Sequence, residues 1–347
     1  MGVGAGPAVT SLGITPASAA KALAAFQISC PSLLRRSDAS GLTQPEDWSA
    51  ACAAAARWPA SQAEAFFQGY FETAEVGAGE AFATGYFEPQ ILGSRVRRSG
   101  YEVPVYAKPA DLLEVNPLTG EKGRGRLENG DYVLYYDRAQ IADGALAGRG
   151  LEIGWAADPI DLFFLHIQGS GRLLLPDGGV MRIGYAGQNG RDYVGIGRLM
   201  KERGLLGPGE TSMQGIVAWL RAHPEEGRAI MRENKSYIFF RELTGPGPIG
   251  AMGHPVTPRA TIAADPNFVP LGAPVFLAVD KPVASGLWVA QDTGGAIKGA
   301  NRFDTFWGAG AEAKRIAGGM QANGDAYVLL PKGTVSRLNS DYAASRR

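Results

Sequence analysis

The chain has 347 residues, which exceeds one ordinary domain and favours two. Hydrophobic residues make up 45% of it, and its 48 glycines and 22 prolines are spread along the sequence, so a turn-rich globular protein is favoured over a disordered one. The formal net charge is zero and there is no long basic run, which argues against nucleic acid as a partner. No stretch approaches the roughly 20 apolar residues of a membrane span.

Cys30 and Cys52 are the two cysteines of the chain. They leave two alternatives open: two free buried thiols, or a disulfide that closes a loop of about twenty residues and contributes on the order of 3 kcal/mol. A disulfide would imply an oxidising compartment. No Cys/His spacing is typical of zinc, so no metal is expected. Upstream, the small residues 16–20 resemble a signal-peptide cleavage context.

The N-terminal quarter is predicted to be helical. Thr43 and Glu46 have the spacing of a capping box before a helix over residues 47–57. A second helix is expected after Pro59. The side chains on its apolar face are Ala63, Phe66, Phe67 and Tyr70.

The middle of the chain, from residue 84 on, is predicted to be extended and rich in turns. Residues 174–180 indicate a hairpin turn, and the charged, glycine-rich residues 119–130 are expected to form a solvated loop. Strands are expected over residues 84–89, 103–106, 132–136, 161–168, 172–175 and 180–185.

Two helices are predicted next, over about residues 193–203 and 212–222, followed by a strand over residues 237–241. The Gly/Pro cluster 244–254 is typical of a linker. The last hundred residues return to strands, with one short helix over residues 311–316. These strands are expected over residues 260–264, 274–279, 287–291 and 327–330.

Histidine is scarce, since His166, His223 and His254 are scattered through the chain. A metal site or a Ser-His-Asp triad is therefore poorly supported. His166 is expected to lie on a strand among apolar neighbours and to be structural. Carboxylate chemistry remains as the best-supported mechanism.

The segment 287–308 is the most informative for that chemistry. An apolar strand leads Asp292 into a glycine turn, and twelve residues later Asp304 stands among aromatic side chains. Aromatic neighbours desolvate a carboxyl and raise its pKa, which suits a general acid, and such rings also pack against sugars. Two alternatives stay open: Asp292 as an Asx-turn residue that binds glycine amides, and Asp304 as the cap of a following helix. The aromatic neighbours are Phe303, Phe306 and Trp307.

Asp292, Thr293 and Gly294 also match the catalytic triplet of aspartic proteases. Those enzymes need two such triplets, and this chain has one. An aspartic-type peptidase is therefore a second candidate function, beside acid/base chemistry at Asp304, and a non-catalytic binding module is a third.

A second polar cluster comprises Gln168, Gly169, Ser170 and Gly171. It forms either a tight hairpin or a ligand-facing loop that presents an amide side chain and bare backbone N–H groups. Residues 185–190, which begin with Tyr185, form either a turn or a polar wall for sugar hydroxyls.

Several separated motifs together resemble the membrane-bound lytic murein transglycosylase A family. The C-terminal part is similar to the family's domain named for three aspartates, here Asp265, Asp292 and Asp304. The similarity covers roughly residues 48–330. The upstream motifs are residues 84–89 (TGYFEP), 164–171 (FLHIQGSG), 185–190 (YAGQNG) and 237–240 (YIFF).

The resemblance implies a fold that is mainly β with helices, an α+β class. It implies a double-ψ β-barrel domain with N-terminal helices, made from residues 1–92 and 244–347, of which 243–335 are the three-aspartate part. A smaller inserted β-domain is implied over residues 93–243, with the substrate groove between the two domains.

The resemblance also implies cleavage of the β-1,4 bond between N-acetylmuramic acid and N-acetylglucosamine in peptidoglycan, with formation of a 1,6-anhydromuramoyl end. The C6 hydroxyl of the sugar attacks C1, so one carboxyl can act as acid and then as base. That carboxyl is Asp304, Asp292 would orient or tune it, and Asp265 would be structural.

The expected substrate-binding residues lie in several of these motifs. No metal or organic cofactor is expected. The implied partners are peptidoglycan glycan strands and cell-wall synthesis proteins, for a monomer in the periplasm that is attached to the outer membrane, if at all, by a lipid anchor. The binding residues are Tyr86, Glu88, Gln168, Gly169, Ser170, Gly171, Tyr185 and Lys298.

Overall fold

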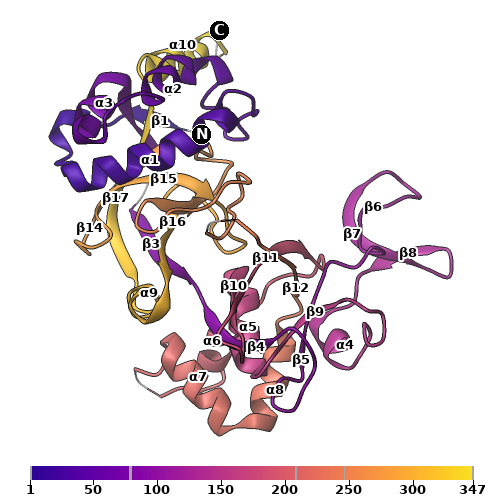
Figure 1. The fold of residues 1–347 in the computed structure, drawn as a ribbon. Helices are drawn as coiled ribbons and strands as arrows, with labels where there is room; N and C mark the ends of the chain where they lie inside the picture. Colours follow the sequence, from indigo (N-terminus) through magenta and orange to yellow (C-terminus); the bar gives the residue numbers. More distant parts are fainter. Residues whose placement is uncertain (1, 78–79, 208, 246, 346–347) are drawn as a thin grey trace. The chain divides into compact units, whose positions relative to one another are not determined.

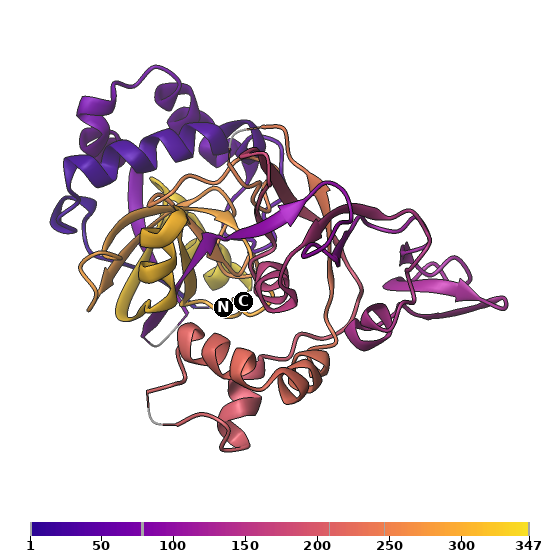
Figure 2. The same ribbon diagram turned by 60° about the horizontal axis from the view of Figure 1, so that its bottom comes forward.

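The computed structural model describes residues 2–77, 80–207, 209–245 and 247–345. The chain divides into two compact units. Met1–Phe87 and Ile249–Arg347 together form one, which we call the barrel unit, and Glu88–Pro248 form the other, which we call the inserted unit. Figures 1 and 2 colour both along the sequence.

The barrel unit is built on an eight-stranded sheet of order β1-β2-β17-β14-β15-β13-β16-β3. Because β17 also pairs with β3, six of these strands close into a barrel. β13 and β15 are parallel, whereas β13 and β16 are antiparallel. The expected α+β class is confirmed, and the expected barrel is present. The strands are β1 (Val3–Ala5), β2 (Phe71–Val76), β3 (Ala81–Glu88), β13 (Thr261–Ala264), β14 (Pro274–Val279), β15 (Gly286–Asp292), β16 (Arg302–Ala309) and β17 (Gln321–Pro331).

Helix α1 (Pro16–Leu33) covers strand β15, as Figure 1 shows. Thr15 caps it by accepting the N–H of Ser18, and Pro16 occupies its first turn, where the missing N–H costs nothing. Residues 16–20, which resemble a cleavage context in sequence, form this first turn, and Ala19 is fully buried. Gln291 of β15 donates hydrogen bonds to α1 at the carbonyl of Ala25.

Cys30 and Cys52 form a disulfide that ties α1 to helix α2 (Ser49–Ala55). The disulfide alternative is thereby confirmed. It closes a sequence separation of 22 residues, for which loop-entropy arguments give a stabilisation of about 3 kcal/mol.

The predicted helix over residues 47–57 is instead a 3₁₀ helix η2 (Pro45–Trp48) followed by α2. The capping box lies one residue later than expected, because the backbone N–H of Gln44 donates to the Asp47 carboxylate over 2.7 Å. The hydroxyl of Thr43 donates to Asp38 and so is unavailable as a cap. The second predicted helix is present as α3 (Ala63–Tyr70), preceded by η3 (Ala60–Gln62).

The inserted unit contains a six-stranded sheet of order β12-β11-β10-β4-β9-β5 and a three-stranded sheet of order β6-β7-β8. Its strands are β4 (Gln90–Ser94), β5 (Val103–Tyr106), β6 (Leu113–Val115), β7 (Lys122–Glu128), β8 (Asp131–Leu134), β9 (Glu152–Ala156), β10 (Ser170–Leu174), β11 (Val180–Gln188) and β12 (Ile238–Glu242). Its helices are α4 (Arg138–Ala142), α5 (Pro159–Gln168), α6 (Ile196–Glu202), α7 (Met213–Ala222) and α8 (Pro224–Glu233).

Two expectations for this unit are wrong. Residues 161–168 are a helix, not a strand, because Asp158 accepts the N–H groups of Ile160 and Asp161 and Pro159 starts the turn. His166 is therefore a buried helical residue that stacks on Phe240. Residues 119–130 are not a loop throughout, because they contain strand β7, which forms an antiparallel hairpin with β8.

The remaining predictions agree with the structure at the level of element type. β10 and β11 form the expected hairpin, with Leu174 paired to Val180. The later helices are α9 (Gly310–Gly318) and α10 (Thr334–Ser345). In the predicted linker, residue 246 lies outside the described residues, and Ile249 pairs with Pro255. Among the described residues, no helix has the combined length and apolar character needed to cross a bilayer.

Candidate active site

The barrel brings the three aspartates of the C-terminal motif to three adjacent strands, two of them within a strand and one just after a strand. Ala263 of the central strand β13 is the direct partner of both Asp292 on β15 and Asp304 on β16. Neighbouring strands lie about 4.8 Å apart, so the two aspartate Cα atoms are separated by roughly 10 Å across the sheet. Asp265 follows β13 directly.

Asp304 is held by a short chain of hydrogen bonds that starts at an arginine. The hydroxyl of Thr84 donates to Asp304 Oδ1 over 2.7 Å, and Arg302 Nη2 donates to the same hydroxyl over 2.9 Å. Burial raises the pKa of Asp304 to about 6, although the Thr84 hydrogen bond and the Arg302 charge oppose the rise. A carboxyl with a pKa near 6 can both hold and release a proton close to neutral pH.

Of the three aromatic side chains predicted around this carboxyl, Phe306 lies two residues beyond Asp304 and shares its face of β16, whereas Phe303 and Trp307 lie an odd number of residues away and project to the opposite face. Phe303, Phe306 and Trp307 are all at most 5% exposed, and the Phe306 ring lies 4.9 Å from that of Tyr86. The alternative that Asp304 caps a helix is wrong, because Asp304 lies within β16 and helix α9 begins only at Gly310.

Asp292 accepts three hydrogen bonds. Tyr86 donates its hydroxyl to Oδ2 over 2.9 Å, and the N–H groups of Ala251 and Thr293 donate to Oδ1 over 3.0 and 2.9 Å. Burial raises the pKa of Asp292, and burial with the nearby Asp292 charge raises that of Tyr86 well above 10. The Tyr86 hydroxyl therefore stays protonated at any working pH and donates a hydrogen bond to Asp292. The alternative in which Asp292 binds the amides of the following glycines is therefore not the arrangement seen, because its donors are Tyr86, Ala251 and Thr293.

Asp265 is bound by its own turn. It accepts hydrogen bonds from the backbone N–H and side-chain amide of Asn267 and from the N–H of Gly299. Burial opposes its ionisation, yet these donors and the charge of Lys298 hold the pKa of Asp265 below its usual value. The hydrogen bonds of Asp265 join its own turn to the backbone at Gly299, and Lys298 is exposed beside it.

The predicted binding residues of the inserted unit meet where helix α5 turns into strand β10. Gln168 ends the helix, and Gly169 adopts a left-handed conformation with φ of 76° that favours glycine. A Cβ at Gly171 would lie 2.5 Å from Leu165, so close packing also requires this glycine. Ser170 pairs with Gly184 on β11, and Tyr185 beside it is exposed.

Glu88 is buried, with 1% of its side chain exposed. Its Oε2 accepts a hydrogen bond from Arg172 Nε over 2.8 Å, and its Oε1 faces two nitrogens of Arg182 at 3.4 Å. Both carboxylate oxygens are therefore occupied by arginines, and this side chain does not present itself to a sugar.

Thr84, Arg302, Arg172 and Arg182 are functional candidates that the sequence interpretation did not single out. One signal could have found the first, because Thr84, Tyr86 and Glu88 alternate along one strand and so point to the same face. Nothing in the local sequence indicates the arginines.

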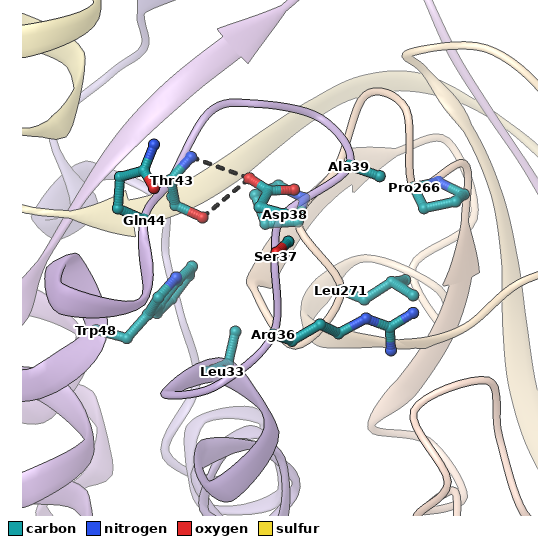
Figure 3. A pocket seen from close by; sticks show the side chains of 11 residues that line it. Leu33, Arg36, Ser37, Asp38, Ala39, Thr43, Gln44, Trp48, Pro266 and Leu271 are labelled. Atoms are coloured by element: carbon teal, nitrogen blue, oxygen red, sulfur yellow. Dashed lines mark hydrogen bonds between the residues drawn. The ribbon is translucent and has the colours of Figure 1, made fainter.

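A small cavity of about 60 Å³ lies elsewhere in the barrel unit, beside Trp48 and Leu271. Figure 3 shows its acid, Asp38, already bound by Thr43. This volume suits a few water molecules rather than a sugar chain. Within the described part of the chain, no group of three or more His, Cys, Asp or Glu residues is arranged to hold a metal ion.

Comparison with known proteins follows this division of the chain. Residues 82–241 match the MltA specific insert domain, and residues 260–330 match the 3D domain. The crystal structure of membrane-bound lytic murein transglycosylase from Agrobacterium tumefaciens is 31% identical in sequence and covers 97% of this chain and 99% of its own, with a TM-score of 0.85. The chain belongs to the MltA family.

Two further MltA relatives bear on function. The crystal structure of E. coli MltA with bound chitohexaose is 26% identical and covers 91% of this chain and 90% of its own, with a TM-score of 0.69. The membrane-bound lytic murein transglycosylase A of Vibrio cholerae is 36% identical over 192 residues, which are 52% of each chain. This MltA-family chain therefore spans about half the length of that curated relative.

Proposed function

We propose that this MltA-family chain is a lytic transglycosylase of peptidoglycan. It cleaves the β-1,4 bond between N-acetylmuramic acid and N-acetylglucosamine and leaves a 1,6-anhydromuramoyl end. The observation that carries the proposal is the carboxyl of Asp304, which is buried, has a pKa of about 6 and accepts a hydrogen bond from Thr84. The names of the relatives and the chitohexaose bound by E. coli MltA support a glycan substrate.

In the first step, protonated Asp304 donates its proton to the glycosidic oxygen as the bond from C1 of the muramic acid to that oxygen breaks. In the second step, the C6 hydroxyl oxygen of the same sugar bonds to C1, and the Asp304 carboxylate takes the hydroxyl proton. The acid is thereby regenerated and no water is consumed. Ordinary glycosidases need a second carboxylate for a nucleophile or a water-activating base, and the internal hydroxyl replaces it here.

Between the steps Asp304 carries a negative charge in a desolvated site. Thr84 donates a hydrogen bond to that charge, and Arg302 binds the same hydroxyl. Charge-assisted hydrogen bonds of this kind are stronger than neutral ones. Asp292 acts on Asp304 from β15, on the far side of β13, because its negative charge favours the protonated form of Asp304.

The remaining assignments belong to the same proposal. Tyr86, Gln168, Ser170 and Tyr185 contact sugars by stacking and hydrogen bonding, and Lys298 contributes a positive charge. The partners are glycan strands and cell-wall synthesis proteins, and the protein is a monomer of the periplasm, associated with the outer membrane. A domain division at residues 92–93 and 243–244 accompanies this assignment. The peptidase alternative is not favoured in a chain of the MltA family.

The product decides the function. Purified sacculi digested in ¹⁸O-labelled water are expected to release muropeptides that are one water lighter than hydrolysis products and contain no label at the muramic acid end. Mass spectrometry of the soluble products reads both features. Labelled, reducing muramic acid ends would show a hydrolase, and intact glycan with cleaved protein substrates would show a peptidase.

Thr84→Val is expected to lower kcat about tenfold, because the Asp304 carboxylate loses one charge-assisted hydrogen bond. The same loss raises the pKa of Asp304 further above about 6, so the alkaline limb of the kcat/KM profile moves to higher pH. Thr84→Ser keeps the hydroxyl and serves as the control. An unmoved alkaline limb in the valine variant, or an equal defect in the serine variant, would contradict this role.

A further inference from the structure

We propose that the inserted unit binds a carboxylate of the muramoyl side chain through the guanidinium of Arg172, which Glu88 positions. The inference rests on the proposed function and adds a specificity determinant to it. The site would separate murein, whose muramic acid residues carry lactyl groups and peptide stems, from glycans built of N-acetylglucosamine alone.

Strand register places three arginines on one face of the inserted sheet. Arg172 of β10 and Arg182 of β11 are direct cross-strand partners, and such partners project to the same face. Gly184 lies two residues beyond Arg182 and pairs with Arg241 of β12, so Arg241 shares that face. Ser170 also shares it, since it lies two residues before Arg172. The opposite face packs into the apolar core of the unit.

The charge on this face is unbalanced. Two arginines directly opposite each other repel, and the buried Glu88 offsets only one of the two charges. Arg241 is exposed and has no ion-pair partner among the described residues. The nearby Arg95 and Glu242 neutralise each other at 2.6 Å. The face therefore holds an excess of positive charge that favours an anionic ligand.

The three arginines are not equivalent. Arg182 is 17% exposed and also donates to the carbonyl oxygen of Gly245, so most of its guanidinium donors already have partners within the unit. Arg172 is 33% exposed and donates to Glu88 through Nε alone. Both terminal nitrogens of Arg172 have no partner in the described part of the chain. A guanidinium fixed at Nε with its two terminal nitrogens open presents the geometry that a carboxylate accepts.

The neighbours of Arg172 suit a sugar acid rather than a bare ion. Ser170 supplies a hydroxyl on the same face, and the exposed Gln90 pairs directly with Arg172 on β4. Murein offers a carboxylate from two sources: the lactyl group where the peptide has been removed, and the stem peptide where it remains. Both carry the same chemistry, and chitin-type glycans have neither.

Binding of three probes tests the inference in the full chain carrying Asp304→Asn, which prevents turnover. The probes are stem-bearing murein strands, murein strands stripped of peptide, and chitohexaose. Arg172→Gln is expected to raise the Kd for one or both murein probes about tenfold and to leave the Kd for chitohexaose within about twofold. Arg172→Lys keeps the charge but not the two parallel N–H donors of the guanidinium, so its Kd for the murein probes should lie between those of the parent and Arg172→Gln. Arg228→Gln removes an exposed arginine of the same unit and is the matched control.

Glu88→Gln tests the positioning role, because it keeps all three arginines but weakens the anchor of Arg172. It is expected to reduce the preference for murein strands over chitohexaose, which a purely structural defect would not do. Thermal unfolding of each variant checks that the fold is retained.

If Arg172→Gln weakens binding of stem-bearing strands alone, the arginine recognises the stem carboxylates. If it weakens binding of stripped strands alone, the arginine recognises the lactyl carboxylate. Equal changes for murein and chitohexaose, or no change for either, overturn the inference while the proposed function stands. Arg172-dependent binding of phosphate-bearing lipopolysaccharide without any effect on murein also overturns it. If the parent binds no glycan, the inference and the proposed function fall together.

Discussion

Asp304→Asn is expected to lower the release of anhydromuropeptides from purified sacculi by about a thousandfold or more. One carboxyl performs both proton transfers, and each positioned acid or base typically contributes a factor of about 10²–10⁴. Asparagine preserves the size of the side chain and can still accept the Thr84 hydrogen bond, but it has no proton to donate to the leaving oxygen. Liquid chromatography with mass spectrometry quantifies the released products.

Asp325→Asn is the matched control for that experiment. Asp325 lies exposed on β17 of the same barrel, so its replacement should leave the rate unchanged. Turnover close to that of the unmodified chain in the Asp304→Asn variant would remove Asp304 from the acid/base role. Equal loss in both variants would point to a general effect on the barrel instead.

The same Asp304→Asn variant is expected to be more stable than the unmodified chain at pH about 7, by up to about 3 kcal/mol. The folded pKa of Asp304 is about 6, whereas an unfolded aspartate titrates near about 3.9. A raised folded pKa means that folding disfavours the ionised form, so the contribution of Asp304 to stability is fully present below pH about 4. It is lost as the pH rises to about 6 and beyond. Asparagine does not titrate and avoids this loss.

Urea unfolding of both proteins at pH about 4, 5.5 and 7 measures the effect as a difference in the free energy of unfolding. The difference should grow with pH and level off above about 6.5. Other carboxyls titrate in both proteins and cancel in the difference. A difference that stays constant, or that shrinks as the pH rises, would contradict the raised pKa. The two experiments together would show a residue that costs stability where it serves catalysis.

The burial of Asp304 could be predicted in part from sequence, because the apolar residues around it indicate a buried strand. Phe306 shares the face of Asp304 wherever the strand goes, whereas Phe303 and Trp307 project from the opposite face and help to bury the strand rather than the carboxyl. Thr84 is different, because 220 residues separate it from Asp304. Only barrel closure brings the two together, and no periodicity in either segment indicates which strand pairs with which.

The wrong secondary-structure predictions also have causes in the local sequence. The apolar run before Gly169 has no polar face, so strand and helix fit it equally well by periodicity. The deciding signal was Asp158 before Pro159, a cap and first-turn pair that outweighs the β-like composition. Strand β7 was not predicted, because many of its residues are charged or exposed, whereas β8 overlaps the strand predicted over residues 132–136. The barrel itself was inferred from resemblance to the family and not from any pattern of residues.

Arg182 connects the two ends of the inserted unit, which bears on the order in which the chain folds. Its guanidinium holds both Glu88, the first residue of the inserted unit, and the carbonyl of Gly245, close to the last. Once the inserted unit has folded, the ends of a long intervening segment are already together. The entropy of closing that segment is then spent within the inserted unit, and the end of β3 is joined to the chain that resumes at Ile249 as if by a short link. We therefore expect the inserted unit to fold before the barrel closes, with the slow, non-local strand pairing left for last.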